Sequence, residues 1–336
     1  MENSRKAPCT DPLQASWNAC IEDWVRPGQT LVVGLSGGLD SMSLLHWLAS
    51  NLPHGQHRLG ALHVHHNLSP NANDWADACQ SACDGLAVPL SIVRVDVERG
   101  SPDGLEAAAR RARHATYAQA GGDWIVLAHH RGDQAETLLF NLLRGSGVRG
   151  AGAMRQRHGQ LLRPWLGMDR NTILNYARRV GLHWIEDESN ADVRYSRNFL
   201  RHRILPLLQE RFPSAEERLT AAAGHFGTAQ ALLDDLARID LASTPAVFPL
   251  PVSQLRNLSQ ARALNLLAFL LRASGVAVTG ESRLDEALRQ FLTAGDDRHP
   301  AISFGEHQLV RRRGMIELTM PEIDPLAGIV KRTHAI

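Results

Sequence analysis

The sequence predicts an α/β fold: an open, doubly wound, mostly parallel five-stranded sheet, followed by a smaller, mainly helical C-terminal domain. Short apolar runs alternate with helical stretches over the first half of the chain, and a glycine-rich turn follows the first run. The composition then changes near residue 214. Strands separated by helices form βαβ units, and their crossovers are almost always right-handed, so a doubly wound sheet is expected.

The expected strands share apolar, often β-branched side chains and lie at 30–36, 59–65, 90–97, 124–128 and 161–165. The helical patterns between them are long enough for crossover helices and cover 40–51, 72–86, 105–120 and 133–143. Residues 144–160 (RGSGVRGAGAMRQRHGQ) are rich in glycine and arginine, which predicts a mobile loop.

The rest of the chain is mainly helical. Helical patterns lie at 169–180, 197–211, 214–241, 259–274 and 282–293, and strand-like runs at 301–304 and 315–320. Three prolines, at 245, 249 and 251, follow the longest of these helices. We therefore expect an N-terminal domain over 1–213, a C-terminal domain over 214–320 and a tail over 321–336.

Composition excludes several classes of protein. The 336 residues are 44% apolar, enough for a sizeable core, yet no apolar run reaches membrane-spanning length and the N-terminus lacks a signal-peptide pattern. The four cysteines all precede residue 84, which excludes a disulfide scaffold and favours a reducing compartment. We expect a cytoplasmic protein with no membrane partner.

The formal net charge of +1 conceals an uneven distribution. Residues 131–213 hold 14 basic and 8 acidic side chains, and all 14 are arginines. Residues 1–130 hold 9 and 13, and residues 214–336 hold 13 and 14. Arginine can both fork to phosphates and stack on bases, so the middle segment is a candidate nucleic-acid surface. The alternative is a generally arginine-rich composition, since Lys6 and Lys331 are the only lysines.

The turn after the first expected strand, Ser36-Gly37-Gly38-Leu39-Asp40-Ser41, is a candidate phosphate site because its backbone amides and the following helix N-terminus attract anions. A Walker A loop would need Lys-Ser/Thr where Asp40-Ser41 stands, and the glycine spacing does not fit the dinucleotide fingerprint. The run from Gly34 also matches the G-x-S-x-G elbow of hydrolases. Only one strand precedes it, which disfavours that interpretation.

Histidines and acids follow other expected strands. His63-Val64-His65-His66-Asn67 closes the second strand and His129-His130 the fourth, at the sheet edge where α/β proteins bind ligands. His63 and His65 share a strand face, so a metal site is one interpretation, and a satisfied or substrate-facing histidine is the favoured one.

Asp133 and Glu136 are three residues apart at a helix start, so both carboxylates lie on one face. An aspartate there is also a good helix cap. With Asp40 they form three acids beside a phosphate site, which suits a Mg²⁺–nucleotide complex. Arg110 follows Glu106 on the helical pattern at 105–120 and could reach a phosphate or an activated intermediate.

Together with the loop, seven later segments resemble the tRNA(Ile)-lysidine synthases of the PP-loop ATP pyrophosphatase superfamily. In order they are 63–68 (HVHHNL), 106–110 (EAAAR), 129–137 (HHRGDQAET), 144–147 (RGSG), 163–164 (RP), 186–190 (EDESN) and 197–201 (RNFLR). The resemblance covers residues 29–212, and residues 214–320 resemble the family's first C-terminal domain. It implies an adenine-nucleotide alpha-hydrolase-like sheet.

The resemblance implies an ATP-dependent ligase that forms a C–N bond. ATP would adenylate C2 of the wobble cytidine of a tRNA(Ile) with a CAU anticodon, releasing pyrophosphate. Free L-lysine would then displace AMP and give lysidine, which converts the tRNA from methionine to isoleucine specificity. The implied cofactors are ATP and Mg²⁺, and the implied oligomeric state is a homodimer.

The resemblance also implies residue roles. Residues 36–41 and His63 would bind ATP, and Asp40 would hold Mg²⁺. Arg110 would steady the adenylated base. Asp133 and Glu136 would receive the lysine ammonium, with His129 lining the same pocket. Arg197 and Arg201 would lie near substrate or phosphate.

The chain departs from the family at two places. Many relatives carry an aspartate where Gly132 stands, which puts a mechanism with two adjacent acids in doubt. Longer relatives also continue into a second C-terminal domain, for which the residues after 320 are too few.

Two other functions stay open. A tRNA-thiolating PP-loop enzyme would need site cysteines for sulfur or an iron–sulfur cluster, and none occurs after Cys83. A non-catalytic tRNA- or nucleotide-binding module would keep the phosphate loop without the chemistry.

Overall fold

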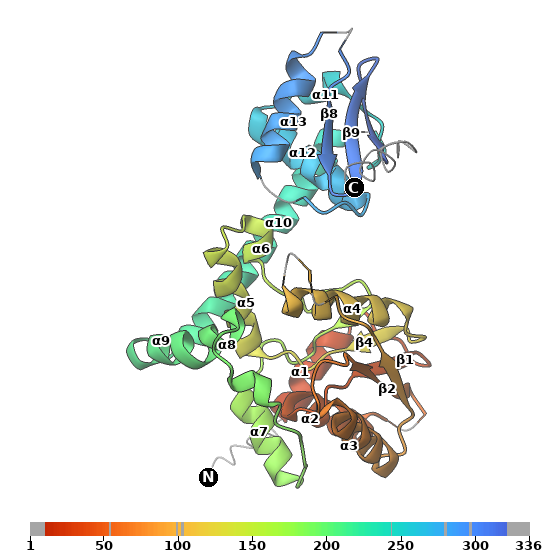
Figure 1. The fold of residues 1–336 in the computed structure, drawn as a ribbon, viewed down its shortest axis with the longest axis vertical. Helices are drawn as coiled ribbons and strands as arrows, with labels where there is room; N and C mark the ends of the chain where they lie inside the picture. Colours follow the sequence, from red (N-terminus) through yellow and green to blue (C-terminus); the bar gives the residue numbers. More distant parts are fainter. Residues whose placement is uncertain are drawn as a thin grey trace, which may run out of the picture. The chain divides into compact units, whose positions relative to one another are not determined.

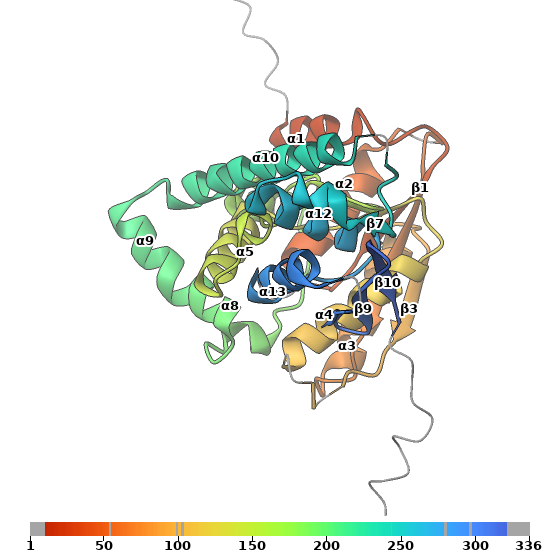
Figure 2. The ribbon, with the colours of Figure 1, turned by 90° about the horizontal axis from the view of Figure 1, so that it is seen from above.

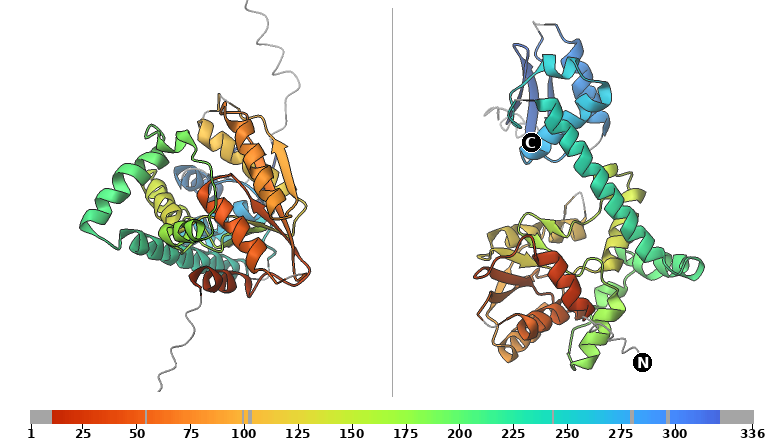
Figure 3. Two further views of the ribbon diagram at one scale, coloured as in Figure 1. Left: turned by 90° about the horizontal axis from the view of Figure 1, so that it is seen from below. Right: turned by 180° about the vertical axis from the view of Figure 1, so that it is seen from behind.

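The computed structural model describes residues 11–320, except residues 54, 99, 102–103, 243, 279–280 and 296–297. The expected tail at 321–336 therefore lies outside the described residues. The chain divides into two compact units, one up to Gly227 and one from Thr228. Helix α10 (Ala215–Leu241) runs through this division as one continuous helix (Figure 3). The expected boundary after residue 213 falls just before the helix begins.

A six-stranded sheet forms the centre of the first unit (Figure 1). Its order is β3 (Leu90–Arg94), β2 (Arg58–His65), β1 (Thr30–Gly34), β4 (Trp124–Val126), β6 (Leu161–Leu162) and β5 (Arg157–His158). The first five strands are parallel, and β5 pairs antiparallel with β6. The doubly wound, mostly parallel sheet is confirmed, but it has six strands where five were expected.

Helices cover both faces of this sheet because its strands are apolar on both sides. One face packs against α1 (Pro12–Ile21), α2 (Leu39–Asn51), α3 (Ala72–Gly85) and α7 (Arg170–Arg179), in a core around Leu31, Val33 and four buried tryptophans. The other face packs against α4 (Leu105–Gln119) through Leu62, Ile125 and Tyr117. Helix α1 is absent from the prediction, although Asp11 caps it and Pro12 begins it, the usual start signal.

The segment expected to be a mobile loop, 144–160, is structured. It contains helix α6 (Val148–Ala151) and strand β5. Helix α5 (Arg131–Leu143) anchors it: the Gln134 side chain donates to the Met154 carbonyl at 2.8 Å and accepts from its amide at 2.9 Å. Asn141 Nδ2 donates to the Gly150 carbonyl at 2.7 Å. The prediction is wrong because these contacts come from outside the segment and override its composition.

The chain from α7 to α10 is helical, as predicted, but less regular. Its short elements are η1 (Glu188–Ala191), α8 (Ser196–Phe199), η2 (Leu200–Ile204) and α9 (Leu205–Arg211). Element η2 is a π-helical turn, a wider turn often found at functional sites.

The second unit combines helices with an antiparallel sheet. Helices α11 (Val252–Arg256), α12 (Gln260–Ala273) and α13 (Glu281–Thr293) lie beside strands β7 (Leu250–Pro251), β10 (Met315–Thr319), β9 (His307–Arg312) and β8 (Ala301–Phe304) (Figures 1 and 2). Leucines of α12 pack with Phe291, Phe304 and Ile316 in its core. The prediction contains β8 and β10 but lacks β7 and β9. None of the helices among the described residues is long and apolar enough to span a bilayer.

Candidate functional site

The glycine-rich turn links β1 to α2 and leaves its backbone open to a ligand. Gly37 has φ +86°, and a Cβ there would lie 3.0 Å from Ile185 Cδ1 and 3.3 Å from Cys79 Sγ. Glycine adopts this φ without strain, and any side chain at this position would be crowded by these two neighbours. Ser41 Oγ accepts from the Ser36 amide at 3.1 Å and lies 3.0 Å from Ser36 Oγ, so the two serines fix the turn. Because α2 begins at Leu39, its free amides face the same turn.

A pocket of about 640 Å³ adjoins this turn, which is room for a nucleoside. Ser36, Gly38 and His63 line it, together with Tyr117 from α4 and Ile185. His63 is buried, and its Nδ1 lies 2.9 Å from the Leu35 carbonyl. If Nδ1 carries the proton, Nε2 is the acceptor. Burial lowers the pKa of His63, so the neutral ring is favoured.

Three acids gather beside the turn, as the sequence predicts. Asp40 lies in the first turn of α2, and Asp133 and Glu136 lie in the first turns of α5. Burial raises the pKa of Asp40 and of Glu136. Burial also opposes the charge of Asp133, but His130, through its backbone amide as well, and Arg201 outweigh it and lower the pKa of Asp133. These three carboxylates are hereafter called the acid cluster.

Arg201, from the π-helical turn η2, bridges two members of the acid cluster. Its Nε donates to Glu136 Oε1 at 2.6 Å, and its Nη2 donates to Glu136 Oε2 and Asp133 Oδ1, both at 2.9 Å. Burial opposes the charge of this guanidinium, yet Glu136 and Asp133 raise its pKa overall. The carboxylates expected to bind the lysine ammonium therefore bind the Arg201 guanidinium in this structure.

His130 joins the acid cluster to the start of α5 and is missing from the residues predicted for the site. The Gly132 amide donates to His130 Nδ1 at 3.1 Å, so the neutral ring carries its proton on Nε2. That Nε2 lies 3.6 Å from Asp133 Oδ2 and 3.9 Å from Asp40 Oδ2. A Cβ at Gly132 would lie 3.0 Å from His130 Cε1, so the ring already fills the space that a larger residue at 132 would need. The sequence feature that indicates His130 is its position three residues before Asp133.

The remaining predicted residues lie around a strongly cationic region. Burial, with the charges of Arg197, Arg113 and Arg163, lowers the pKa of Arg110 to about 10. Burial also lowers the pKa of His129 to about 3, so this ring is neutral, and its buried Nδ1 has no hydrogen bond. Arg197 Nε lies 3.4 Å from Glu106 Oε1, and its guanidinium lies over the Phe140 ring at 5.5 Å. Arg197 is thus not on the carboxylates that Arg201 bridges.

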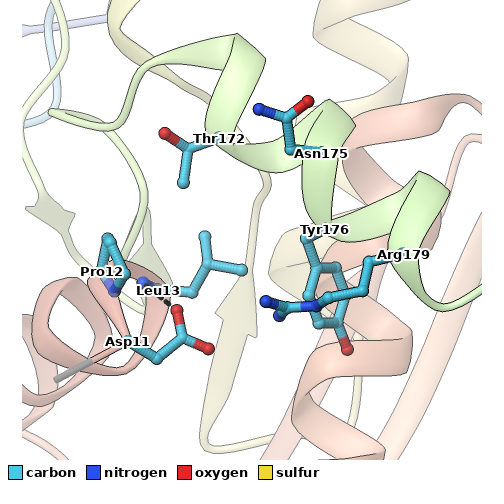
Figure 4. A pocket seen from close by; sticks show the side chains of 7 residues that line it. All are labelled: Asp11, Pro12, Leu13, Thr172, Asn175, Tyr176 and Arg179. Atoms are coloured by element: carbon cyan, nitrogen blue, oxygen red, sulfur yellow. Dashed lines mark hydrogen bonds between the residues drawn. The ribbon is translucent and has the colours of Figure 1, made fainter. Parts of the chain in front are cut away.

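No group of three or more His, Cys, Asp or Glu side chains among the described residues forms a ready metal site, His63 and His65 included. A smaller pocket of about 260 Å³ lies between the start of α1 and the side of α7, from Thr172 to Arg179 (Figure 4). None of the residues that line it, such as Asp11 and Arg179, belongs to the acid cluster or the turn.

Comparisons with known proteins agree on one family. Residues 10–208 match the model of the PP-loop domain, and residues 250–316 match the TilS substrate binding domain. The chain is 42% identical to tRNA(Ile)-lysidine synthase of Nitrosomonas europaea over 91% of this chain and 69% of that protein. It is 49% identical to the enzyme of Aromatoleum aromaticum over 79% of this chain and 63% of that protein.

Among solved structures, the chain is similar to the U34-tRNA thiolase NcsA of Methanococcus maripaludis, which was determined with its [4Fe-4S] cluster. The TM-score is 0.53 at 16% identity, over 63% of this chain and 77% of that one, and this shows a shared fold. The described cysteines Cys20, Cys79 and Cys83 are buried, and none lines the larger pocket. Burial raises the pKa of Cys79 to about 12, the opposite of what a metal-binding thiolate needs. The chain belongs to the tRNA(Ile)-lysidine synthases, a family of ATP-dependent ligases built on the PP-loop domain.

Proposed function

We propose that this chain forms lysidine from the wobble cytidine of tRNA(Ile) with a CAU anticodon, using ATP and free L-lysine. One observation supports the proposal: His130 Nε2 lies 3.9 Å from Asp40, which follows the candidate phosphate-binding turn, and 3.6 Å from Asp133, which shares the Arg201 guanidinium with Glu136. The family matches supply the tRNA substrate and the use of ATP. The chain spans about two thirds of the length of these relatives.

In the first step, the C2 oxygen of cytidine attacks the α-phosphorus of ATP. The bond from that phosphorus to the bridging oxygen breaks, and the electron pair leaves with pyrophosphate. The amides of residues 37–41 would bind the phosphates. Mg²⁺ would neutralise the phosphate charge, and Asp40 would hold it; the buried Oδ1 of Asp40, which has no hydrogen bond, supports this role. One carboxylate fits an ion that takes its other ligands from phosphates and water.

In the second step, the ε-amine of lysine attacks C2, and the C2–O bond breaks as AMP leaves. Asp133 and Glu136 would bind the lysine ammonium in place of the Arg201 guanidinium, which satisfies the same oxygens now. The raised pKa of Glu136 makes it the better proton acceptor of the two when the ammonium is converted to an amine. Arg110 and neutral His129 would face the adenylated base.

The anticodon stem would approach the arginine-rich segment 131–213. Arg157 is already engaged there, because its guanidinium lies 5.4 Å from the Trp124 ring centroid and 5.7 Å from that of Trp24. Charge reversal at Arg149 or Arg155 is expected to weaken tRNA binding and reduce its salt slope by about one, with ATP binding intact. Filter binding at several salt concentrations measures this. Unchanged tRNA affinity in both variants, and in an Arg157 variant, would remove the segment from the interface.

Mass spectrometry of the cytidine tests the function directly. After incubation of the protein with tRNA(Ile), ATP and lysine, the nucleoside should gain the mass of one lysine minus water. No gain rejects the proposal. Conversion of labelled ATP to AMP and pyrophosphate only when tRNA is present would exclude a non-catalytic binding module. Light scattering would test the homodimer, which stays a prediction.

A further inference from the structure

Arg201 and Arg170 contact the acid cluster, and Arg131 begins the helix that carries Asp133 and Glu136. The three arginines differ in how fully their charge is paired. Arg201 makes three hydrogen bonds to Glu136 and Asp133. Arg131 is paired with Asp169 at 2.5 Å and with Glu217 at 3.1 Å. Arg170 Nε lies 3.6 Å from Asp40 Oδ1, which is close enough for an ion pair but too long for a hydrogen bond. Of the three arginines, Arg170 therefore makes the weakest ion pair.

The fold fixes the place of Arg170 beside the phosphate-binding turn. It is the first residue of α7, whose start is capped by Asp169: the carboxylate accepts from the Asn171 amide at 2.7 Å. Ile173 and Tyr176 of α7 are buried in the same core as Leu44 and Leu48 of α2. Asp40 lies in the first turn of α2. The packing of α7 on α2 therefore brings the Arg170 side chain, 56% exposed, to the mouth of the turn.

We propose that Arg170 binds the β- and γ-phosphates of ATP and stabilises the pyrophosphate as it leaves. This inference rests on the proposed first step. When the bond between the α-phosphorus and its bridging oxygen breaks, the departing pyrophosphate gains negative charge next to the carboxylate of Asp40. Backbone amides carry only partial charges, so a full positive charge at this edge offsets the repulsion. A guanidinium can also fork to two phosphate oxygens.

The test compares product inhibition of the wild type with that of Arg170→Ala, Arg170→Lys and a control, Arg58→Ala. Arg58 is exposed, begins β2 and lies outside the segment 131–213. In Arg170→Ala, the pyrophosphate concentration needed to inhibit AMP formation should rise about tenfold or more, while inhibition by AMP stays unchanged. The turnover of the first step should fall about a hundredfold. Arg170→Lys should recover part of both effects, and Arg58→Ala should behave as wild type.

Pyrophosphate inhibition equal to wild type in Arg170→Ala would overturn the proposal. Equal weakening of pyrophosphate and AMP inhibition would also overturn it, because that indicates general damage to the site. Calorimetric titration of inorganic pyrophosphate into wild type and Arg170→Ala gives the same comparison without turnover. If the wild type forms no AMP yet binds pyrophosphate through Arg170, the proposed function fails while the assignment of Arg170 stands.

Discussion

Each unit of the molecule contains an arginine–carboxylate network, and the two networks are built differently. In the second unit, the fully buried Asp240 pairs with Arg262, and Asp234 pairs with Arg272 at 2.7 Å. These pairs join α10 to α12, and each acid has its own arginine. In the first unit, Asp133 and Glu136 share one arginine, Arg201.

The difference separates structural pairs from a binding site. Matched pairs between two helices give each carboxylate a guanidinium of its own and so balance its charge. Asp133, half-buried, and Glu136, buried, share one guanidinium and hold a surplus of negative charge, and this costs stability unless another cation arrives. A network with such a surplus is expected to affect activity when it is mutated, and a matched network is expected to affect stability.

The largest effect should follow from Asp40→Asn. We expect tRNA-dependent exchange of pyrophosphate into ATP to fall below detection, because the charge placed beside the phosphates is lost. Burial raises the pKa of Asp40, so its ionised form is costly in the folded state and its removal should not lower the Tm. Retained exchange in a well-folded Asp40→Asn variant would end the role of Asp40 at the phosphates.

Glu136→Gln separates the two chemical steps. We expect the lysine step to fall about a hundredfold, roughly 2.7 kcal/mol, while formation of the adenylated tRNA persists. The amide keeps the shape of the side chain but can neither pair with the ammonium nor accept its proton. Rapid-quench measurement of each step provides the test, with Glu217→Gln, at an exposed partner of Arg131, as the matched control. Equal losses in both steps would contradict a lysine-specific role.

The smallest catalytic effect should come from Asp240→Ala. Its removal leaves Arg262 without the buried carboxylate that binds it, so calorimetry should show a lower Tm for the second unit. ATP binding to the first unit should be unchanged. An unaltered Tm together with weaker ATP binding would reverse the comparison between the two networks.

The parts of the fold predicted from sequence are those with a strong local pattern. The apolar strands β1 and β2 and the turn between β1 and α2 follow directly from neighbouring residues. The segment 144–160 does not, because Gln134 and Asn141 of α5 impose its shape. Strand β9 (HQLVRR) carries polar residues at both ends, and only its pairing with β8 and β10 reveals it.

The candidate site shows the same division. The shared face of Asp133 and Glu136 follows from their spacing on one helix. The contact of Arg201 with them does not, because it spans 65 residues of sequence and depends on how η2 packs against α5. The place of Arg170 depends similarly on tertiary packing, because α7 packs on α2. His130 differs, because its neighbours Gly132 and Asp133 in the chain hold it at the start of α5.

The π-helical turn at Leu200–Ile204 has a consequence for how the chain can vary. Such a turn holds one residue more than an α-helical turn, so it sets the rotational phase between the helix before it and the helix after it. Loss of one residue there would rotate one side relative to the other by about 100°. The Arg201 side chain would then no longer reach Glu136, even though every charged residue was retained. The contacts of Arg201 with Asp133 and Glu136 therefore depend on the number of residues in this turn as well as on their identity.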